Sequence, residues 1–341
     1  MKRLNGFMKG VNLGGWLSQG EYTKEHLDSF IGENDIKTIA SWGLDHVRLP
    51  IDYNIFEKDD GTPIGTGFGY IDSALEWCAK YNLNMVLDLH KCYGYSFYSG
   101  DGEVGFFDSA ELQDRFCKLW ERLAVRYAKY ADRLAFELLN EVNDPKYKDS
   151  WNAIAARTIA MIRGYSKDIK IFLGSYWNNS VDALHDLDLP ADENIVYNFH
   201  CYDPFLFTHQ GAYWVDEMPQ DLRVDFPGDI KVYRQKMVET GLTRIQDYLD
   251  VPDSGFDVNY FEGRFRNAVK LCEDRGVCLY CGEYGVIDRA DPEQILHWYK
   301  CINPVFEKYG IGRSAWNYKE KDFGLSDERM KPVIGELVKY L

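Results

Sequence analysis

The sequence predicts a (β/α)8 barrel, or TIM barrel, in which eight parallel strands close into a cylinder and helices surround them. Short apolar runs rich in branched residues recur eight times along the 341 residues, and longer amphipathic stretches separate them. A chain of this length with 45% hydrophobic residues can form the core of one such barrel. The alternative, a doubly wound open sheet, normally carries a glycine fingerprint at its first turn, and the segment 10–15 lacks that spacing.

The eight apolar runs are the predicted strands. Because each is followed by a longer amphipathic stretch, we expect parallel strands that are joined by helices. The expected strands are 7–13, 46–50, 85–89, 134–139, 169–173, 195–199, 277–281 and 312–316. The clearest helical patterns lie at 71–81, 108–130 and 151–165, and Asp108 and Ser150 are the expected N-caps of the last two.

The spacing of the strand ends predicts one domain, 1–341, with an insertion. Only the interval between the sixth and seventh strand ends is much longer than one strand–helix unit. We assign the excess to 203–257, a helical subdomain in the loop after strand six that covers the barrel mouth. Within it, 229–248 has a helical pattern. The residues that mark the strand ends are Asn12, Arg48, His90, Glu141, Gly174, His200, Glu283 and Trp316.

Charge and composition exclude several classes of partner. The net charge of −15, from 54 acidic and 39 basic residues, argues against a nucleic-acid partner or an anionic membrane surface. No run of about 18 apolar residues is present, so no transmembrane helix is expected. The first residues carry no apolar run behind their basic side chains, which predicts a cytoplasmic protein, or a secreted one whose leader is absent from this sequence. We expect a monomer.

The eight cysteines are scattered through apolar segments, which favours reduced, buried thiols over a disulfide framework. Cys278 and Cys281 form the only closely spaced pair, and no second pair accompanies them. We therefore expect no structural metal at these cysteines and no cofactor.

Two glutamates are the candidate catalytic acids. Glu141 follows the fourth predicted strand and Glu283 follows the seventh. Groups at the carboxyl ends of barrel strands converge on one pocket, and a carboxylate at the end of a buried strand is costly unless it is paired or functional. Two carboxyl groups across a pocket can divide the work of glycoside hydrolysis: one protonates the leaving oxygen, and the other attacks the sugar or activates water.

Other polar residues at the strand ends can support this pair. Asn140 can bind the sugar 2-hydroxyl, and Arg48 can keep a nucleophilic carboxylate ionised. His90 and His200 can shape the pocket and orient the acid, and Tyr202 can donate to the nucleophile. The alternative for the two histidines is a zinc site with Glu283, although single ligands on separate strands give this little support.

Flat aromatic rings suit the apolar faces of sugars. Trp316 lies at the end of the eighth strand, and Trp177 and Trp214 lie in the loops after the fifth and sixth, so all three are candidate sugar platforms. For Trp16, just after the first strand, both platform and core remain open. The tryptophans within helical patterns are expected in the core: Trp42, Trp77, Trp120, Trp151 and Trp298.

Taken together, these residues resemble glycoside hydrolase family 5, the cellulase family. The resemblance extends from Gly10 to about Lys331 and rests on ordered motifs: Arg48-Leu49-Pro50, His90, Asn140-Glu141, His200-Cys201-Tyr202, Gly282-Glu283-Tyr284-Gly285 and Trp316. The segment 198–210 looks like that of clostridial-type endoglucanases with a subdomain in loop six. The resemblance implies that Glu141 is the acid/base and Glu283 the nucleophile. The chain departs from the family pattern at Val142, where proline is usual, and at Lys91, where a second histidine is frequent.

The predicted activity is therefore retaining hydrolysis of a β-glucan polysaccharide or oligosaccharide, by endo attack on β-1,4 or mixed-linkage β-1,3-1,4 chains. A retaining mechanism requires carboxyl groups about 5 to 5.5 Å apart. The segment 10–16 also resembles exo-acting 1,3-β-glucanases of the same family, which leaves exo action open. β-Mannan hydrolysis, transfer to another sugar, and a non-catalytic carbohydrate-binding barrel are the remaining alternatives.

Overall fold

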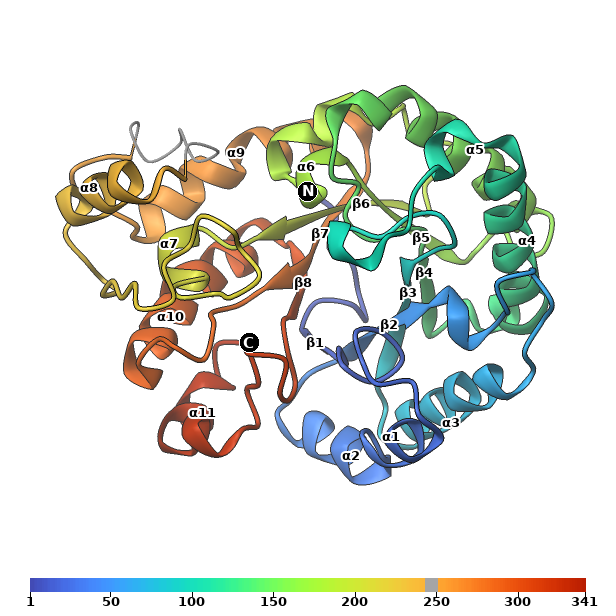
Figure 1. The fold of residues 1–341 in the computed structure, drawn as a ribbon, viewed down its shortest axis with the longest axis horizontal. Coiled ribbons are helices and arrows are strands. Elements are labelled where there is room, and N and C mark those ends of the chain that lie inside the picture. The colour runs from blue at the N-terminus through green and yellow to red at the C-terminus, as the bar shows by residue number, and fades with distance from the viewer. Residues whose placement is uncertain (243–250) are drawn as a thin grey trace.

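The computed structural model describes residues 1–242 and 251–341 and confirms the predicted barrel. Eight parallel strands pair in sequence order, and β8 closes the cylinder on β1. Figure 1 shows the strands at the centre of the molecule with helices around them. Every observed strand overlaps its predicted run: β1 Gly10–Asn12, β2 His46–Asp52, β3 Asn84–Lys91, β4 Leu134–Glu137, β5 Lys170–Gly174, β6 Ile195–Cys201, β7 Cys278–Tyr284 and β8 Gly312–Ala315.

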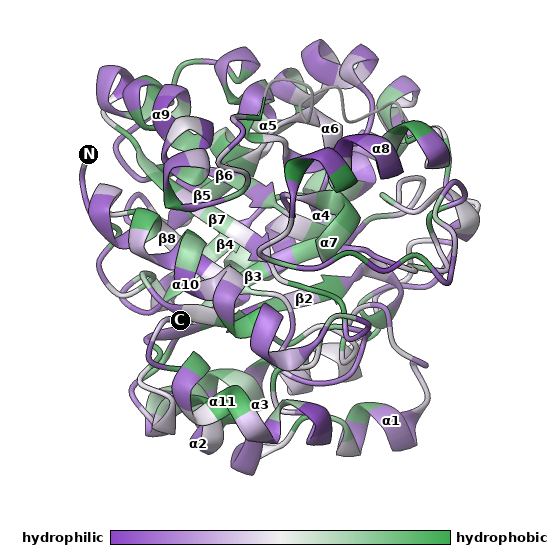
Figure 2. Ribbon diagram, turned by 90° about the vertical axis from the view of Figure 1, so that its left-hand side faces the viewer, coloured by the Kyte–Doolittle hydropathy of each residue, from purple (hydrophilic) through white to green (hydrophobic). Residues whose placement is uncertain are grey.

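The helices cover the outside of the barrel. Figure 2 shows that they alternate between hydrophilic and hydrophobic residues, whereas the central strands are mostly hydrophobic. One apolar stripe of each helix therefore packs on the strands while the rest faces water. The α-helices are α1 Lys24–Ser29, α2 Glu33–Ser41, α3 Thr66–Lys80, α4 Ala110–Tyr127, α5 Lys148–Arg163, α6 Tyr176–Asn179, α7 Phe205–Thr208, α8 Ile230–Thr240, α9 Val258–Arg275, α10 Pro292–Tyr309 and α11 Lys331–Leu337.

Both predicted N-caps are wrong. The hydroxyl of Ser109, one residue after Asp108, accepts the hydrogen bond from the third helical N–H of α4. Ser150 lies inside α5, because Asp144 and Pro145 begin a short 3-10 turn that leads directly into that helix. Asp144 caps the turn through its carboxylate, and proline is favoured at a first helical position because it lacks an N–H.

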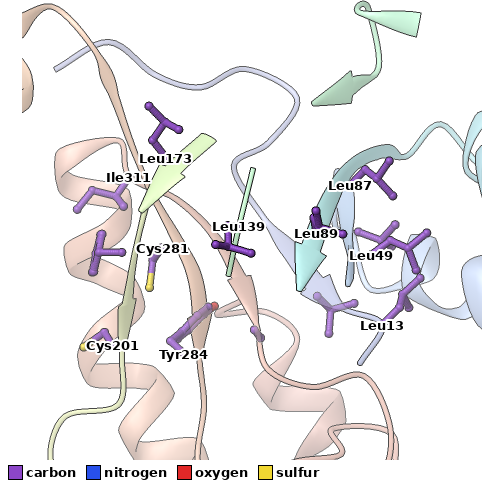
Figure 3. Close-up of a cluster of buried hydrophobic side chains, with 14 of the residues drawn as sticks. Leu13, Leu49, Leu87, Leu89, Leu139, Leu173, Cys201, Cys281, Tyr284 and Ile311 are labelled. Atoms are coloured by element: carbon purple, nitrogen blue, oxygen red, sulfur yellow. The ribbon is translucent and has the colours of Figure 1, made fainter. Parts of the chain in front are cut away.

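Side chains alternate along each strand between two apolar layers. One face forms a cluster inside the barrel, in which Val86, Phe172 and Tyr280 meet Leu4 and Phe7 from the amino-terminal segment. The other face packs against the helices. Figure 3 shows two groups on that face, Leu13, Leu49, Leu87 and Leu89 beside β2 and β3, and Cys201, Cys281 and Tyr284 beside β6 and β7.

The same alternation directs polar side chains into the barrel interior near the carboxyl ends of the strands. On β3, Leu87 and Leu89 belong to the outer apolar cluster, while Asp88 and His90 are buried and bond to groups on other strands or loops. Burying polar groups is costly unless they are hydrogen-bonded, so the residues of this layer need partners from neighbouring strands. The layer lies at the carboxyl ends of the strands, where the candidate catalytic residues were predicted.

Between β6 and α9, the described residues, 202–242 and 251–257, contain α7, α8 and connecting loops. Figure 1 shows α7 and α8 to one side of the strands. Ring stacking of Phe207 on Phe226 and packing of Tyr233 against Phe256 give this segment apolar contacts of its own. The predicted helix 229–248 is confirmed over Ile230–Thr240, and its part at 243–248 lies outside the described residues. A separate subdomain at 203–257 stays a prediction.

All eight cysteines are free thiols, and six of them are buried. The predicted reduced state therefore fits the fold. Among the helices of residues 1–242 and 251–341, none combines the length and apolarity that crossing a membrane requires.

Candidate active site

Glu141 and Glu283 lie close together at the carboxyl ends of β4 and β7. A carboxylate oxygen of each, and a ring nitrogen of His200, lie within 4.8 Å of one another. Both glutamates are almost completely buried, with 8% of Glu141 and 5% of Glu283 exposed. Glu141 has a left-handed backbone with φ of 41°, a conformation that non-glycine residues rarely adopt and that is concentrated at functional sites.

Glu283 is surrounded by donors to both of its oxygens. The Nη1 of Arg48 donates to Oε1 at 2.8 Å, and the hydroxyl of Tyr202 donates to Oε2 at 2.9 Å. Burial raises the pKa of Glu283, but the positive charges of His200 and Arg48 outweigh burial and hold the pKa well below its ordinary value. Glu283 is therefore an ionised carboxylate across the ordinary pH range, as a nucleophile requires.

Arg48 is the centre of the buried polar layer. Glu137 holds its guanidinium in a bidentate pair, with both N–O distances at 2.8 Å, and Asp88 lies 3.0 Å from Nη2. The side-chain oxygens of Asn12 and Asn140 each accept from it at 2.9 Å. Because every N–H direction has a fixed partner, the guanidinium cannot turn away from Glu283.

Glu137 and Asp88 were missed by the sequence analysis. Burial raises the pKa of both, in spite of Arg48, and the pKa of Asp88 reaches about 7. Three carboxyl groups, these two and Glu283, share the single guanidinium of Arg48. The layer therefore keeps Glu283 ionised, whereas burial and repulsion between the crowded carboxyls raise the pKa of Asp88 and Glu137.

His200 connects the two glutamates. Its Nδ1 is 2.7 Å from Glu141 Oε1 and 3.6 Å from Glu283 Oε2. Burial lowers the pKa of His200, but the carboxylates of Glu283 and Glu141 raise it by more, so the net shift is upward. The prediction that His200 lies at the acid agrees with this position.

The hydrogen-bond partners of His90 are groups other than the two glutamates. Its Nδ1 is 2.7 Å from Asp88, and its Nε2 is 2.9 Å from the Gln19 amide. Burial is the main reason that the pKa of His90 is lowered, so the ring is neutral at ordinary pH. The ring stacks on Trp316 at 5.8 Å with an 8° angle between the planes, and Asn140 lies 3.5 Å from Nε2.

The three candidate sugar platforms differ in exposure. Trp316 is 6% exposed, and its ring packs so closely on Gly14 that a Cβ there would lie 2.5 Å from it. Trp214 is half-buried beside Phe323, and Trp177 is 54% exposed. Trp16 belongs to the core, because it is 1% exposed and its ring N–H donates to the Leu27 carbonyl.

Of the five tryptophans expected in the core, Trp120, Trp151 and Trp298 are fully buried, and Trp42 and Trp77 are partly buried against the same cluster.

A contact that the sequence analysis missed comes from the loop after β5. The Nδ2 of Asn178 donates to Glu141 Oε2 at 3.1 Å. No spacing rule indicates such a contact, because it depends on the conformation of the loop.

Among the described residues, one group of side chains has the spacing of metal ligands, and it consists of Glu141, His200 and Glu283. His90, which the zinc alternative required, bonds instead to Asp88 and Gln19. Both oxygens of Glu283 already accept hydrogen bonds, and the neighbouring guanidinium of Arg48 repels a cation. The donor arrangement suits a pair of catalytic carboxyls better than a metal centre.

The comparisons with known proteins agree with this geometry. Residues 8–322 match the cellulase family, glycosyl hydrolase family 5. The chain belongs to this family. It is 46% identical to cellodextrinase A of Ruminococcus flavefaciens over 315 residues, covering 92% of this chain and 86% of that protein. It is also 40% identical to endoglucanase C of Acetivibrio thermocellus over 339 residues, covering 98% of both chains.

A solved structure of an endoglucanase has a similar fold. The crystal structure of endoglucanase Cel5A from the hyperthermophilic Thermotoga maritima matches with a TM-score of 0.76 at 23% identity, covering 98% of this chain and 97% of that one. This similarity supports the barrel fold. Membership of family 5 confirms that the protein is a glycoside hydrolase, and its substrates are accordingly polysaccharides or oligosaccharides.

Proposed function

We propose that this family 5 member is a retaining endo-β-glucanase that cleaves β-1,4-linked or mixed-linkage glucan chains. The observation that carries the mechanism is the proximity of Glu141 and Glu283, whose carboxylate oxygens approach within 4.8 Å. Retaining enzymes have carboxyl groups about 5 to 5.5 Å apart, whereas inverting enzymes need about 6.5 to 9.5 Å to admit a water molecule. The short separation favours attack by a carboxylate over attack by water.

In the proposed mechanism Glu283 is the nucleophile. Its lowered pKa and its fixed donors, Arg48 and Tyr202, support this role, because they hold an ionised oxygen in one orientation. One Glu283 oxygen attacks the anomeric carbon, the bond to the leaving oxygen breaks, and a covalent glycosyl-enzyme forms.

Glu141 is the proposed acid/base. In the first step its carboxylic proton passes to the leaving oxygen, and in the second step its carboxylate takes a proton from the water that attacks the anomeric carbon. The hydrogen bond from His200 to Oε1 orients the group in both steps. Return of the proton restores the starting enzyme.

The surrounding residues are assigned to substrate binding. Asn140 is fixed by Arg48 beside the glutamates and is proposed to bind the sugar 2-hydroxyl. Trp316, stacked on His90, is proposed as the floor beneath the sugar at the cleavage point. Trp177 is exposed and precedes Asn178, which bonds to Glu141, and Trp214 is half-buried beside Phe323; both are proposed as further platforms along the chain.

The names of the relatives support the substrate class. The similarity to an endoglucanase over 98% of both chains favours endo attack on a β-glucan, and the similarity to a cellodextrinase favours activity on soluble oligosaccharides as well. We propose a β-1,4-glucan backbone as the preferred substrate, over laminarin or mannan.

Product analysis tests this proposal. The enzyme is incubated with carboxymethyl cellulose, mixed-linkage glucan, laminarin and glucomannan, and viscosity and released oligosaccharides are followed together. We expect an early fall in viscosity and a series of oligosaccharides from the first two substrates. Release of glucose alone, or fastest cleavage of laminarin or glucomannan, contradicts the proposal. A Glu141→Ala and Glu283→Ala double variant controls for contaminating activity.

A further inference from the structure

The short segment labelled α6, after β5, is a turn and not a regular α-helix, because three of its successive residues have left-handed backbone. Trp177, Asn178 and Asn179 have φ values of 53°, 55° and 56°. This conformation costs free energy for residues other than glycine and is least costly for asparagine. A run of three such residues persists only where surrounding contacts hold it, and strained backbone of this kind is concentrated at functional sites.

The turn is fixed directly to the segment that carries Glu141. The backbone N–H of Asn178 donates to the Val142 carbonyl at 3.0 Å. From the other side, the Tyr95 hydroxyl donates to the Glu141 carbonyl at 2.7 Å and accepts from the Asn143 N–H at 2.9 Å. The backbone around the acid is therefore tied to the loops that follow β3 and β5.

Two consecutive amides of the turn reach the acid. Asn178 Nδ2 donates to Glu141 Oε2 at 3.1 Å. Asn179 Nδ2 lies 3.3 Å from His200 Nε2, and His200 Nδ1 lies 2.7 Å from Glu141 Oε1. One amide thus acts on one carboxylate oxygen directly, and the next acts on the other oxygen through the imidazole.

In the neutral ring of His200, Asn179 also favours a hydrogen on Nδ1 over one on Nε2. An amide N–H can only donate, so Nε2 accepts and Nδ1 carries the hydrogen that points at Glu141. The amide fits against Gly174, where a Cβ would lie 2.0 Å from the Asn179 Oδ1. This buried oxygen has no hydrogen-bond partner among the described residues, and it is available to a protonated Nε2 when the amide turns over.

We propose that Asn178 and Asn179 are positioning residues for the acid/base, and that the left-handed turn exists to present their amides to Glu141 and His200. The inference rests on the proposed role of Glu141. N–H donors on both oxygens fix the plane of the carboxyl, so the turn sets the aim of Glu141 at the leaving oxygen.

Asn178→Gly is the most direct variant, because glycine accepts the left-handed backbone without strain and keeps the backbone N–H. Asn178→Asp replaces the donor by a carboxylate of the same shape. The matched control is Asn82→Gly, since Asn82 is also left-handed, with φ of 58°, but precedes β3 at the opposite end of the barrel. These variants separate loss of the amide from a change in the turn.

The readout is kcat/KM for phenyl and 2,4-dinitrophenyl β-cellobioside across pH, which reports the glycosylation step. For Asn178→Gly we expect about tenfold loss on the phenyl substrate, which needs an acid, and less than about threefold loss on the dinitrophenyl substrate, which does not. Asn178→Asp also lacks the donor and should show the same selective loss on the phenyl substrate.

An equal loss on both substrates would show a merely structural role, and no difference from Asn82→Gly would show no role; either result overturns the inference. Glu141→Ala with azide distinguishes this failure from failure of the proposed function. If azide restores turnover in Glu141→Ala while Asn178→Gly behaves as wild type, only the inference is wrong. If Glu141→Ala is fully active, the proposed function is wrong as well.

Discussion

Replacing Tyr202 by phenylalanine tests how the enzyme keeps its nucleophile ionised. The Tyr202 hydroxyl donates to Glu283 Oε2 at 2.9 Å, and burial together with the nearby carboxylates Glu283 and Glu141 raises the pKa of Tyr202 well above its ordinary value. The hydroxyl therefore keeps its proton and donates at every pH at which the enzyme works.

The expected size follows from this single bond. A hydrogen bond to a charged group contributes about 1.5 to 3 kcal/mol, and one pKa unit corresponds to about 1.36 kcal/mol. Removing the donor should raise the pKa of Glu283 by about 1 to 2 units. Because Glu283 must be ionised to attack, the acid limb of kcat/KM moves to higher pH, whereas the alkaline limb, which reports the acid, stays in place.

The assay is kcat/KM for an aryl β-cellobioside across the acid and alkaline limbs. Tyr284→Phe is the matched control, because it removes a buried hydroxyl next to Glu283 in sequence that donates instead to Asn303 on α10 at 3.0 Å. An acid limb that stays in place in Tyr202→Phe, or moves equally in both variants, would refute the reasoning.

Three further outcomes are expected. Glu137→Gln removes half of the bidentate partner of Arg48 and should lower the free energy of unfolding by about 2 to 4 kcal/mol in urea titrations, whereas the exposed Glu121→Gln should change it by less than about 0.5 kcal/mol. Burial raises the pKa of Asp88 to about 7, so the folded state holds a proton that the unfolded state releases near pH 4. The free energy of unfolding should therefore fall by about 1 kcal/mol per pH unit between about pH 4 and 7. Asp88→Asn should reduce this slope. Glu141→Ala should lose activity on poor leaving groups and keep some on excellent ones, where azide should restore turnover because it replaces the water that Glu141 activates in the second step.

Each of these outcomes can fail independently. Equal stability of Glu137→Gln and Glu121→Gln would mean that the bidentate pair contributes nothing to folding. An unchanged pH slope in Asp88→Asn would place the stored proton on another group. Wild-type rates in Glu141→Ala would remove that residue from the mechanism.

The barrel and the proximity of the two proposed catalytic glutamates were predictable because they follow from simple periodicities. Apolar runs that recur at intervals of one strand–helix unit predict parallel strands, and the residue at each carboxyl end faces the common site. Glu141, Glu283, Arg48 and His200 all meet there in the structure. The position of each residue at or just after the end of a predicted strand was enough to identify it.

The buried supports of the site were missed, although the sequence contains a signal for them. Asp88 lies two residues before His90, and Glu137 lies four residues before Glu141, so in each case an even spacing would place both side chains on the same face of an extended strand. A charged residue inside an apolar strand is costly without a partner. Both residues precede the strand ends, so the strand-end positions alone do not indicate them.

The positions of Asn178 and Asn179 could not be derived in the same way. Their amides reach the acid because three residues adopt left-handed backbone, and sequence patterns give only the tolerance of asparagine for that conformation. The wrong cap at Asp108 has a similar origin, since the neighbouring Ser109 offers an equivalent acceptor and the local backbone decides between them.

The central claim is that Glu283 forms a covalent bond to the sugar. The measurement is the mass of the enzyme after incubation with 2,4-dinitrophenyl 2-deoxy-2-fluoro-β-cellobioside, followed by peptic mapping, because the fluorine slows release of the glycosyl-enzyme more than its formation. We predict one fluorocellobiosyl group per chain, attached to the peptide that contains Glu283. An unmodified enzyme that still turns the substrate over, or a label on any other residue, would contradict the account.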